Sequence, residues 1–198
     1  KNAIMALNGG ARIGNFSHNT GEGGLSPYHD KPGGNLVWQI GTGYFGCRDD
    51  EGKFSPKLFA KNASNDNVKM IEIKLSQGAK PGKGGVLPAK KNTVEIAKIR
   101  GVEPHTDVLS PTYHTAFGNV REMVDFIEEL AEKSGLPVGI KSAVGDLSHW
   151  NELADIMKKE NKPIFLSAAG VLNASIAISN LVSNSQAFTA SIWSCNSA

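Results

Sequence analysis

The sequence predicts an α/β protein in which helices alternate with the parallel strands of one sheet. Segments with the apolar spacing of amphipathic helices take turns with short segments rich in β-formers, and this alternation is typical of parallel sheets. The polar residues that stand out as site candidates fall at the C-terminal ends of the expected strands, or in the loops directly after them. Parallel α/β barrels place their chemistry at that end of the sheet.

Length and composition fit one soluble globular domain of 198 residues, of which 40% are hydrophobic. The formal net charge is +2 and no basic run occurs, so no nucleic-acid partner is expected. Cys47 and Cys195 are far apart and show no C-x-x-C spacing, so no metal site, iron–sulfur centre or disulfide framework is expected. A reducing, cytoplasmic compartment fits best. The chain starts at Lys1 without a signal peptide, and we expect a segment of a longer protein.

The first part of the chain is expected to hold two helices and two strands. A rough stripe of Ile4, Leu7 and Ala11 predicts the first helix. The turn GTGYFG at 41–46 formally matches G-x-G-x-x-G, but a charged turn follows it instead of a helix, so no dinucleotide site is expected. The elements expected here are a helix over 2–13, a strand over 15–18, a strand over 35–40 and a helix over 55–62.

The later part of the chain contains the clearest helix, over 120–133. Its apolar stripe includes Met123, Phe126 and Leu130, and Gly135 ends it. The other elements expected after the central strand are a helix over 93–100, a strand over 108–110, a strand over 137–144 and a helix over 148–159 capped by Ser148.

The central stretch, VKMIEIKLSQGAKPGKGGVLP at 68–88, begins as a strand and becomes a glycine-rich loop. Apolar residues alternate with Glu72, Lys74 and Ser76 along the strand. A loop of this kind can bring backbone N–H groups close to an anion, because glycine has no Cβ to block the approach. From the residues alone, a long surface turn with solvated lysines stays an equal alternative.

A second loop, NTGEGG at 19–24, carries a lone carboxylate, Glu22. On the residues alone, a loop carboxylate of this kind is expected to be solvated. The alternative is a functional carboxylate in a loop that follows a strand.

Two motifs, IEIKLSQGAKPGKGG at 71–85 and HNTGEGG at 18–24, resemble the FMN-binding synthase domain of glutamate synthases. LSPYH at 25–29 and WQIGTGYFGCR at 38–48 are similar to the short, single-domain bacterial relatives in particular. The resemblance implies a TIM (β/α)8 barrel, here an incomplete barrel fragment. It covers about residues 2–162, so 1–162 is expected to be part of that barrel and 163–198 a tail outside it.

The resemblance also implies a flavoenzyme that aminates 2-oxoglutarate reductively, through 2-iminoglutarate, to L-glutamate with reduced FMN. The partners implied are a 2-oxo acid, ammonia or glutamine-derived ammonia, and an electron donor protein or NAD(P)H-linked subunit. The sequence shows no glutaminase nucleophile at its start and no cysteine cluster, so ammonia and electrons are expected to come from those partners.

Residue roles follow from the same resemblance. Lys74 and Lys141 would place positive charge beside the flavin, while Glu22 would orient an amine or order its loop. The residues expected to bind the cofactor are Asn19, Thr20, Lys74, Ser76, Gln77 and Lys141; those expected to bind substrate are Gln77, Lys80 and Arg100; those expected to act in catalysis are Glu22 and Lys80. Two structural alternatives stay open: Lys74 paired with Glu72, and Arg100 complementing its helix dipole.

The chain departs from the family pattern in two places. Leu25 and Val86 stand where full-length glutamate synthases carry a glutamate and a glutamine, which puts 2-oxoglutarate in question as the substrate. Residues 163–198 contain no charged side chain and no glycine-rich loop of the kind that holds the FMN phosphate. We expect a truncated or frame-shifted tail. The alternative functions are an inactive barrel fragment or assembly subunit, and an N-methylglutamate synthase-like subunit.

Overall fold

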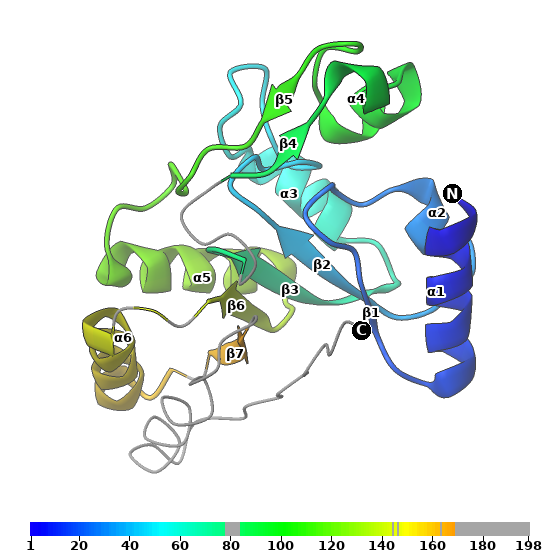
Figure 1. Ribbon diagram of the computed structural model, residues 1–198. Coiled ribbons are helices and arrows are strands. Elements are labelled where there is room, and N and C mark those ends of the chain that lie inside the picture. The colour runs from blue at the N-terminus through cyan, green and yellow to red at the C-terminus, as the bar shows by residue number, and fades with distance from the viewer. Residues whose placement is uncertain (78–83, 144, 146, 163, 169–198) are drawn as a thin grey trace.

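The computed structural model describes residues 1–77, 84–143, 145, 147–162 and 164–168, and its centre is a five-stranded sheet (Figure 1). The strand order is β1-β2-β3-β6-β7, and all neighbouring pairs run parallel. The sheet is an open, curled half-barrel, which confirms the prediction of an incomplete TIM barrel. Its strands are β1 (His18–Asn19), β2 (Leu36–Ile40), β3 (Val68–Lys74), β6 (Val138–Ser142) and β7 (Phe165–Ala168).

The helices begin and end at residues with clear local signals. Ser55 and Asn119 each accept a hydrogen bond from a backbone N–H of the first turn, at 3.4 and 2.9 Å. Gly135 ends its helix in the left-handed conformation, with φ 66°. The helices are α1 (Asn2–Gly14), α2 (Pro27–Asp30), α3 (Pro56–Ala63), the 3₁₀ helix η1 (Ala89–Lys91), α4 (Val94–Arg100), α5 (Val120–Ser134) and α6 (Leu147–Glu160).

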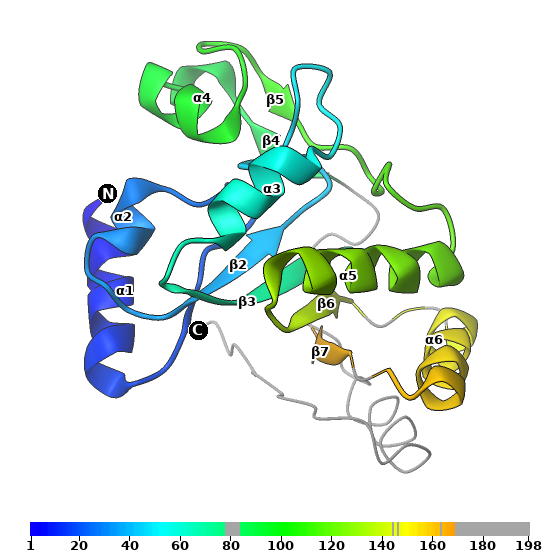
Figure 2. The ribbon, with the colours of Figure 1, turned by 180° about the vertical axis from the view of Figure 1, so that it is seen from behind.

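The hydrophobic core lies between the sheet and the helices α3, α5 and α6, and Figure 2 shows α3 and α5 in front of β2 and β3. Trp38 of β2 stacks on Phe59 of α3, with ring centroids 5.6 Å apart. Phe54 meets Phe126 of α5 edge to face at 5.0 Å. Each fully buried aromatic side chain of this kind contributes about 1.5–3 kcal/mol through burial. The hydrophobic core of the described residues therefore lies on the helical face of the sheet.

The opposite face of the sheet is polar, although it is also largely covered. Ile71 and Ile73 of β3 point to the helices, so Glu72 and Lys74 point to the other face, because successive side chains alternate along a strand. Glu72 is only 3% exposed. Buried charges of this kind need hydrogen-bonding partners, and those partners identify the site described below.

Residues 84–118 form a small excursion between β3 and α5, which we call the flap (Figure 1). It contains α4 and two short strands, β4 (Val86–Leu87) and β5 (Val108–Leu109), which pair antiparallel. The strand predicted over 108–110 therefore exists, but its place in the helix–strand alternation of the parallel sheet was wrong. Leu109 is 69% exposed, as fits a strand outside the core.

Two local features near the start of the chain were not predicted. Asn15 ends α1 with φ 54°, so the strand expected over 15–18 begins only at His18. The short helix α2 was missed; Ser26 and His29 form a capping box around its first turn, with Ser26 N–H donating to His29 Nδ1 at 3.1 Å. Lys80, Cys195 and nearly all of the tail expected over 163–198 lie outside the described residues.

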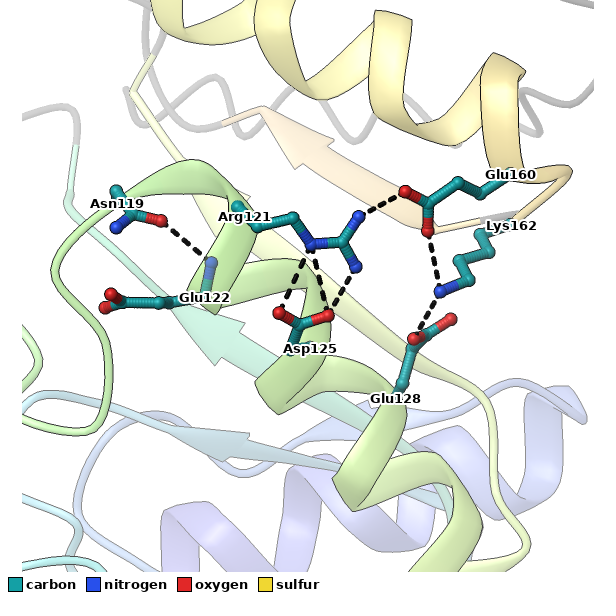
Figure 3. A network of polar contacts seen from close by, with 7 residues as sticks. All are labelled: Asn119, Arg121, Glu122, Asp125, Glu128, Glu160 and Lys162. Atoms are coloured by element: carbon teal, nitrogen blue, oxygen red, sulfur yellow. Dashed lines mark hydrogen bonds and ion pairs between the residues drawn. The ribbon is translucent and has the colours of Figure 1, made fainter.

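A chain of ion pairs joins α5 to the end of α6 (Figure 3). Arg121 binds Asp125 on its own helix and Glu160 at the end of α6. Lys162 extends the chain, because its Nζ lies 2.8 Å from Glu160 and 2.5 Å from Glu128 of α5. This network fixes α6 against α5, just before β7 enters the sheet. No helix in the described part of the chain is long and apolar enough to cross a membrane.

Candidate functional site

A pocket opens at the C-terminal end of β3, beneath the flap. Its walls come from the loop after β1, the loop after β2, the residues directly after β3, and the segments of the flap before β4 and after β5. Its lining residues are Glu22, Thr42, Lys74, Leu75, Ser76, Gln77, Gly84, Gly85, Pro111 and Thr112. The pocket thus lies where a parallel α/β barrel places its chemistry.

Lys74, at the end of β3, is the central cation of the pocket. Its Nζ donates to Glu22 Oε2 at 2.5 Å and to Gln77 Oε1 at 2.9 Å, and its side chain is 10% exposed. The structural alternative in which Lys74 pairs with Glu72 is therefore wrong, and so is the expectation that Glu22 is a solvated carboxylate. The pocket brings together four of the residues singled out from the sequence: Glu22, Lys74, Ser76 and Gln77.

Glycines make room for the Glu22 carboxylate. A Cβ on Gly85 would lie 2.6 Å from Glu22 Oε1, and a Cβ on Gly41 would lie 3.3 Å from the Glu22 Cβ. Gly85 belongs to the flap and Gly41 follows β2. A side chain at position 85 would displace the Glu22 carboxylate, and one at position 41 would crowd its Cβ.

Asn19 holds the loop that carries Glu22. Its Nδ2 donates to Glu72 Oε2 at 2.8 Å, and its Oδ1 accepts from Gly21 N–H at 2.9 Å. Thr20 Oγ1 accepts from Gln39 N–H at 3.0 Å and donates to Gly21 O at 3.0 Å. Both side chains expected to touch a cofactor are therefore engaged within the protein.

Arg100, the last residue of α4, reaches back from the flap toward the Glu22 loop. Its guanidinium carbon lies 4.7 Å from the Phe45 ring centroid, and a Cβ on Gly23 would come within 3.2 Å of its Nη2. Partial burial lowers the pKa of Arg100, against a smaller opposing effect of Glu22. Within the described residues Arg100 makes no hydrogen bond or ion pair, so its charge is free for an anion.

Lys141 and Ser76 complete the polar face beside the pocket. Lys141 lies opposite Lys74 in the β3–β6 register, and its Nζ donates to Gln39 Oε1 at 3.1 Å. Ser76 Oγ lies 3.1 Å from Ser142 Oγ and accepts from Ala143 N–H at 2.9 Å, which ties the ends of β3 and β6 together. Lys80, expected to serve in catalysis and substrate binding, lies outside the described residues.

A buried histidine that the sequence reasoning missed supports the pocket from behind. His114 is 3% exposed; its Nε2 donates to the Lys74 carbonyl at 2.9 Å, so Nδ1 accepts from the Tyr44 hydroxyl at 3.1 Å. That hydroxyl accepts in turn from the Thr115 and Ala116 N–H groups, both at 3.1 Å. Burial lowers the pKa of His114 to about 4, so the ring is neutral at pH 7.

Tyr44 makes these contacts from an unusual backbone conformation, with φ 50°. A bulky residue holds this conformation only where its surroundings compel it, as the hydroxyl contacts do here. Thr42, two residues earlier, donates to the Pro111 carbonyl at 2.6 Å. We call the contact between Tyr44 and His114 the clamp. Its signal in the sequence was SPTYH at 110–114, a polar cluster directly after an expected strand.

The arrangement is suited to binding an anion and an electron-rich cofactor. It combines two ammonium groups, a carboxylate, two amides and the Arg100 guanidinium at one end of a parallel sheet. No three His, Cys, Asp or Glu side chains of the described chain gather in a way that would hold a metal ion.

Comparison with known proteins identifies the family. Residues 1–167 match the family model described as the conserved region in glutamate synthase. The chain is 42% identical over 170 residues to the glutamate synthase large subunit-like protein YerD of Bacillus subtilis, covering 85% of this chain and 32% of that protein. It is 36% identical over 144 residues to the archaeal-type glutamate synthase [NADPH] of Thermotoga sp. (strain RQ2), covering 72% of this chain and 26% of that protein.

A shorter match reaches the ferredoxin-dependent glutamate synthase of Cyanidium caldarium, with 42% identity over 64 residues, 32% of this chain and 4% of that protein. The chain thus spans about a third or less of the length of these relatives. The family match, by contrast, covers most of the chain and includes every described strand but the last residue of β7. The chain belongs to the glutamate synthase family.

Proposed function

We propose that this chain carries part of the active site of an FMN-dependent enzyme that aminates a 2-oxo acid reductively, with 2-oxoglutarate as substrate and L-glutamate as product. The observation that carries the proposal is the cluster of Lys74, Glu22 and Gln77 beside Arg100, which has no ion-pair partner among the described residues, at the C-terminal end of a parallel half-barrel. Residues 1–162 are its barrel segment. Electrons would come from a protein donor or an NAD(P)H-linked subunit, as the names of the relatives suggest for those proteins.

The described residues fit the ring system of FMN. Lys74 and Lys141 are register neighbours on the polar face, so both ammonium groups lie at one end of the sheet. When bound, FMN would supply the hydride that reduces a 2-imino acid. The two lysines would stabilise negative charge on its polar ring edge, and Glu22 and Gln77 would set the position of the Lys74 ammonium.

The 2-oxo acid would be held by Arg100 and Gln77. A guanidinium binds a carboxylate by two parallel hydrogen bonds, and the stacking of Arg100 on Phe45 fixes the plane of that fork. We also assign Lys80 to this carboxylate, from its place in the motif. Glu22 would accept or orient the amine, because its carboxylate is the only one that lines the described part of the pocket.

The test is turnover of the chain with excess FMN, reduced under anaerobic conditions, together with 2-oxoglutarate and ammonium. We expect L-glutamate to form faster than without protein. Replacing Arg100 with Ala or Gln77 with Ala should raise KM by about 10- to 150-fold, the cost of a lost charge-assisted contact. Glutamate formation no faster than the protein-free rate, or equal KM values in parent and variants, would contradict the proposal.

Two other functions are separated by the same assay. Methylamine in place of ammonium would give N-methylglutamate if the chain resembles that synthase. An inactive barrel fragment or assembly subunit would neither turn over nor bind the 2-oxo acid, while still folding.

A further inference from the structure

Glu72 is a buried carboxylate for which the proposed reaction has no use. It lies on β3 two residues before Lys74, so the two side chains share one face of the sheet. Within the described residues it forms no ion pair, and its Oε2 accepts one side-chain hydrogen bond, from Asn19. Burying a carboxylate is costly, which makes Asn19, its hydrogen-bonding partner among the described residues, informative.

The contacts of Asn19 lead from Glu72 back to Lys74. Asn19 Oδ1 accepts from the N–H of Gly21, whose left-handed backbone, with φ 68°, turns the loop. The next residue, Glu22, then reaches Lys74 Nζ at 2.5 Å. The path begins and ends on β3, and each of its links is a hydrogen bond or a single peptide step.

We propose that Glu72 is a positioning residue for Glu22: through Asn19 it holds the turn that sets the Glu22 carboxylate against the Lys74 ammonium. Glu72, on the rigid sheet, fixes the orientation of the loop, and the loop supplies the Glu22 carboxylate that lines the pocket. The value of this arrangement for catalysis rests on the proposed function, but the positioning itself can be measured without flavin or substrate.

The measurement is the acylation rate of each lysine amine in the folded chain, followed by mass spectrometry of its peptides. An amine held by a carboxylate in a covered site reacts slowly. Glu22→Gln weakens that contact directly, so it sets the reference rate for a released Lys74. We expect Glu72→Ala and Asn19→Asp to raise the Lys74 rate about fivefold or more, toward that reference. Asn19→Asp keeps the side-chain shape, and its carboxylate repels Glu72.

A matched control lies one strand away. Gln39 is the register partner of Glu72 on β2 and binds Lys141 instead of Lys74. Gln39→Ala should therefore raise the Lys141 rate and leave the Lys74 rate unchanged. Combining Glu72→Ala with Glu22→Gln should give no increase beyond Glu22→Gln alone, because both changes release the same contact.

Three results would overturn the proposal. An unchanged Lys74 rate in folded Glu72→Ala would show that Glu22 needs no help. Equal rises in the acylation rates of Lys74 and Lys141 in Glu72→Ala would show that Glu72 only stabilises the sheet. If the effects of Glu72→Ala and Glu22→Gln on the Lys74 acylation rate multiply in the double variant, the two residues act on Lys74 independently. If Glu72→Ala does not fold by circular dichroism, Asn19→Asp gives the same three readings, alone and combined with Glu22→Gln.

Discussion

At the scale of single residues, His114 links the pH of the solution to the stability of the pocket wall. Its folded pKa of about 4 lies below the ordinary 6.5, so the unfolded chain binds more protons between these values. The stabilisation is complete above about pH 6.5 and is lost as the pH falls toward 4. The difference corresponds to about 3 kcal/mol.

We therefore expect the free energy of unfolding, from urea titrations, to fall between pH 7 and pH 4.5, and to fall less steeply in His114→Gln. Burial also lowers the pKa of His18 and His29, so part of the slope will stay in that variant. His105, exposed and in the left-handed conformation, provides the control as His105→Asn, which should keep the parental slope. An equal slope in His114→Gln would contradict this account.

Tyr44 is the second residue whose role can be isolated. Tyr44→Phe keeps the ring and removes the hydroxyl, which leaves His114 Nδ1 and two N–H groups of the flap without a partner. We expect a loss of about 1–3 kcal/mol in the free energy of unfolding, measured with urea at pH 7.5. Tyr113→Phe is the matched control. That tyrosine is 72% exposed, so removing its hydroxyl should change the free energy of unfolding by no more than about 0.5 kcal/mol.

At the scale of elements, the ion-pair network between α5 and α6 fixes the helix that precedes β7 (Figure 3). Its members are partly or fully exposed to solvent, so salt should weaken it. We expect Arg121→Met to lower the melting temperature in low salt and to lower it less in about 1 M NaCl, where charges are screened within about 3 Å.

Lys133→Met is the control for that comparison. Lys133 pairs only with Glu129 on the same helix among the described residues, at 3.2 Å, and does not reach α6. At low salt, Lys133→Met should lower the melting temperature less than Arg121→Met does. If the two substitutions have equal effects, the contact between the helices contributes nothing beyond an ordinary surface pair.

At the scale of the whole molecule, the five described strands form an open sheet, so they make up only part of a barrel wall around the polar face. Residues 163–198 contain a single glycine, Gly170, so they offer no glycine-rich loop for a phosphate. We expect the chain to bind FMN with a dissociation constant above about 1 μM, which corresponds to a binding free energy weaker than about −8 kcal/mol. Flavin fluorescence during titration measures it.

Riboflavin, which has no phosphate, is the control ligand for this titration. If the chain holds only the ring system, FMN and riboflavin should bind with similar affinity. A dissociation constant for FMN below about 1 μM, or binding of FMN much tighter than of riboflavin, would show a phosphate site that the sequence did not reveal.

The sequence by itself determined the α/β class, the order of the main helices and strands, and the end of the sheet where the candidate site residues lie. These features depend on local patterns: the apolar stripe of α5, its Asn119 and Gly135 boundaries, and the alternation along β3. The resemblance of its long motifs to a known family also predicted the half-barrel. Helices and strands of this kind are recognisable because their signals lie within one segment of the chain.

Only the tertiary structure decided which partners the site residues take. Sequence spacing left Glu72 open as a partner of Lys74, but the carboxylate in contact comes from Glu22, 52 residues away. The clamp of Tyr44 and His114 and the antiparallel pairing of β4 with β5 were equally hidden. The physical reason is that a parallel sheet gathers the loops of distant strands at one end. Their contacts depend on strand order and register, which no local pattern contains.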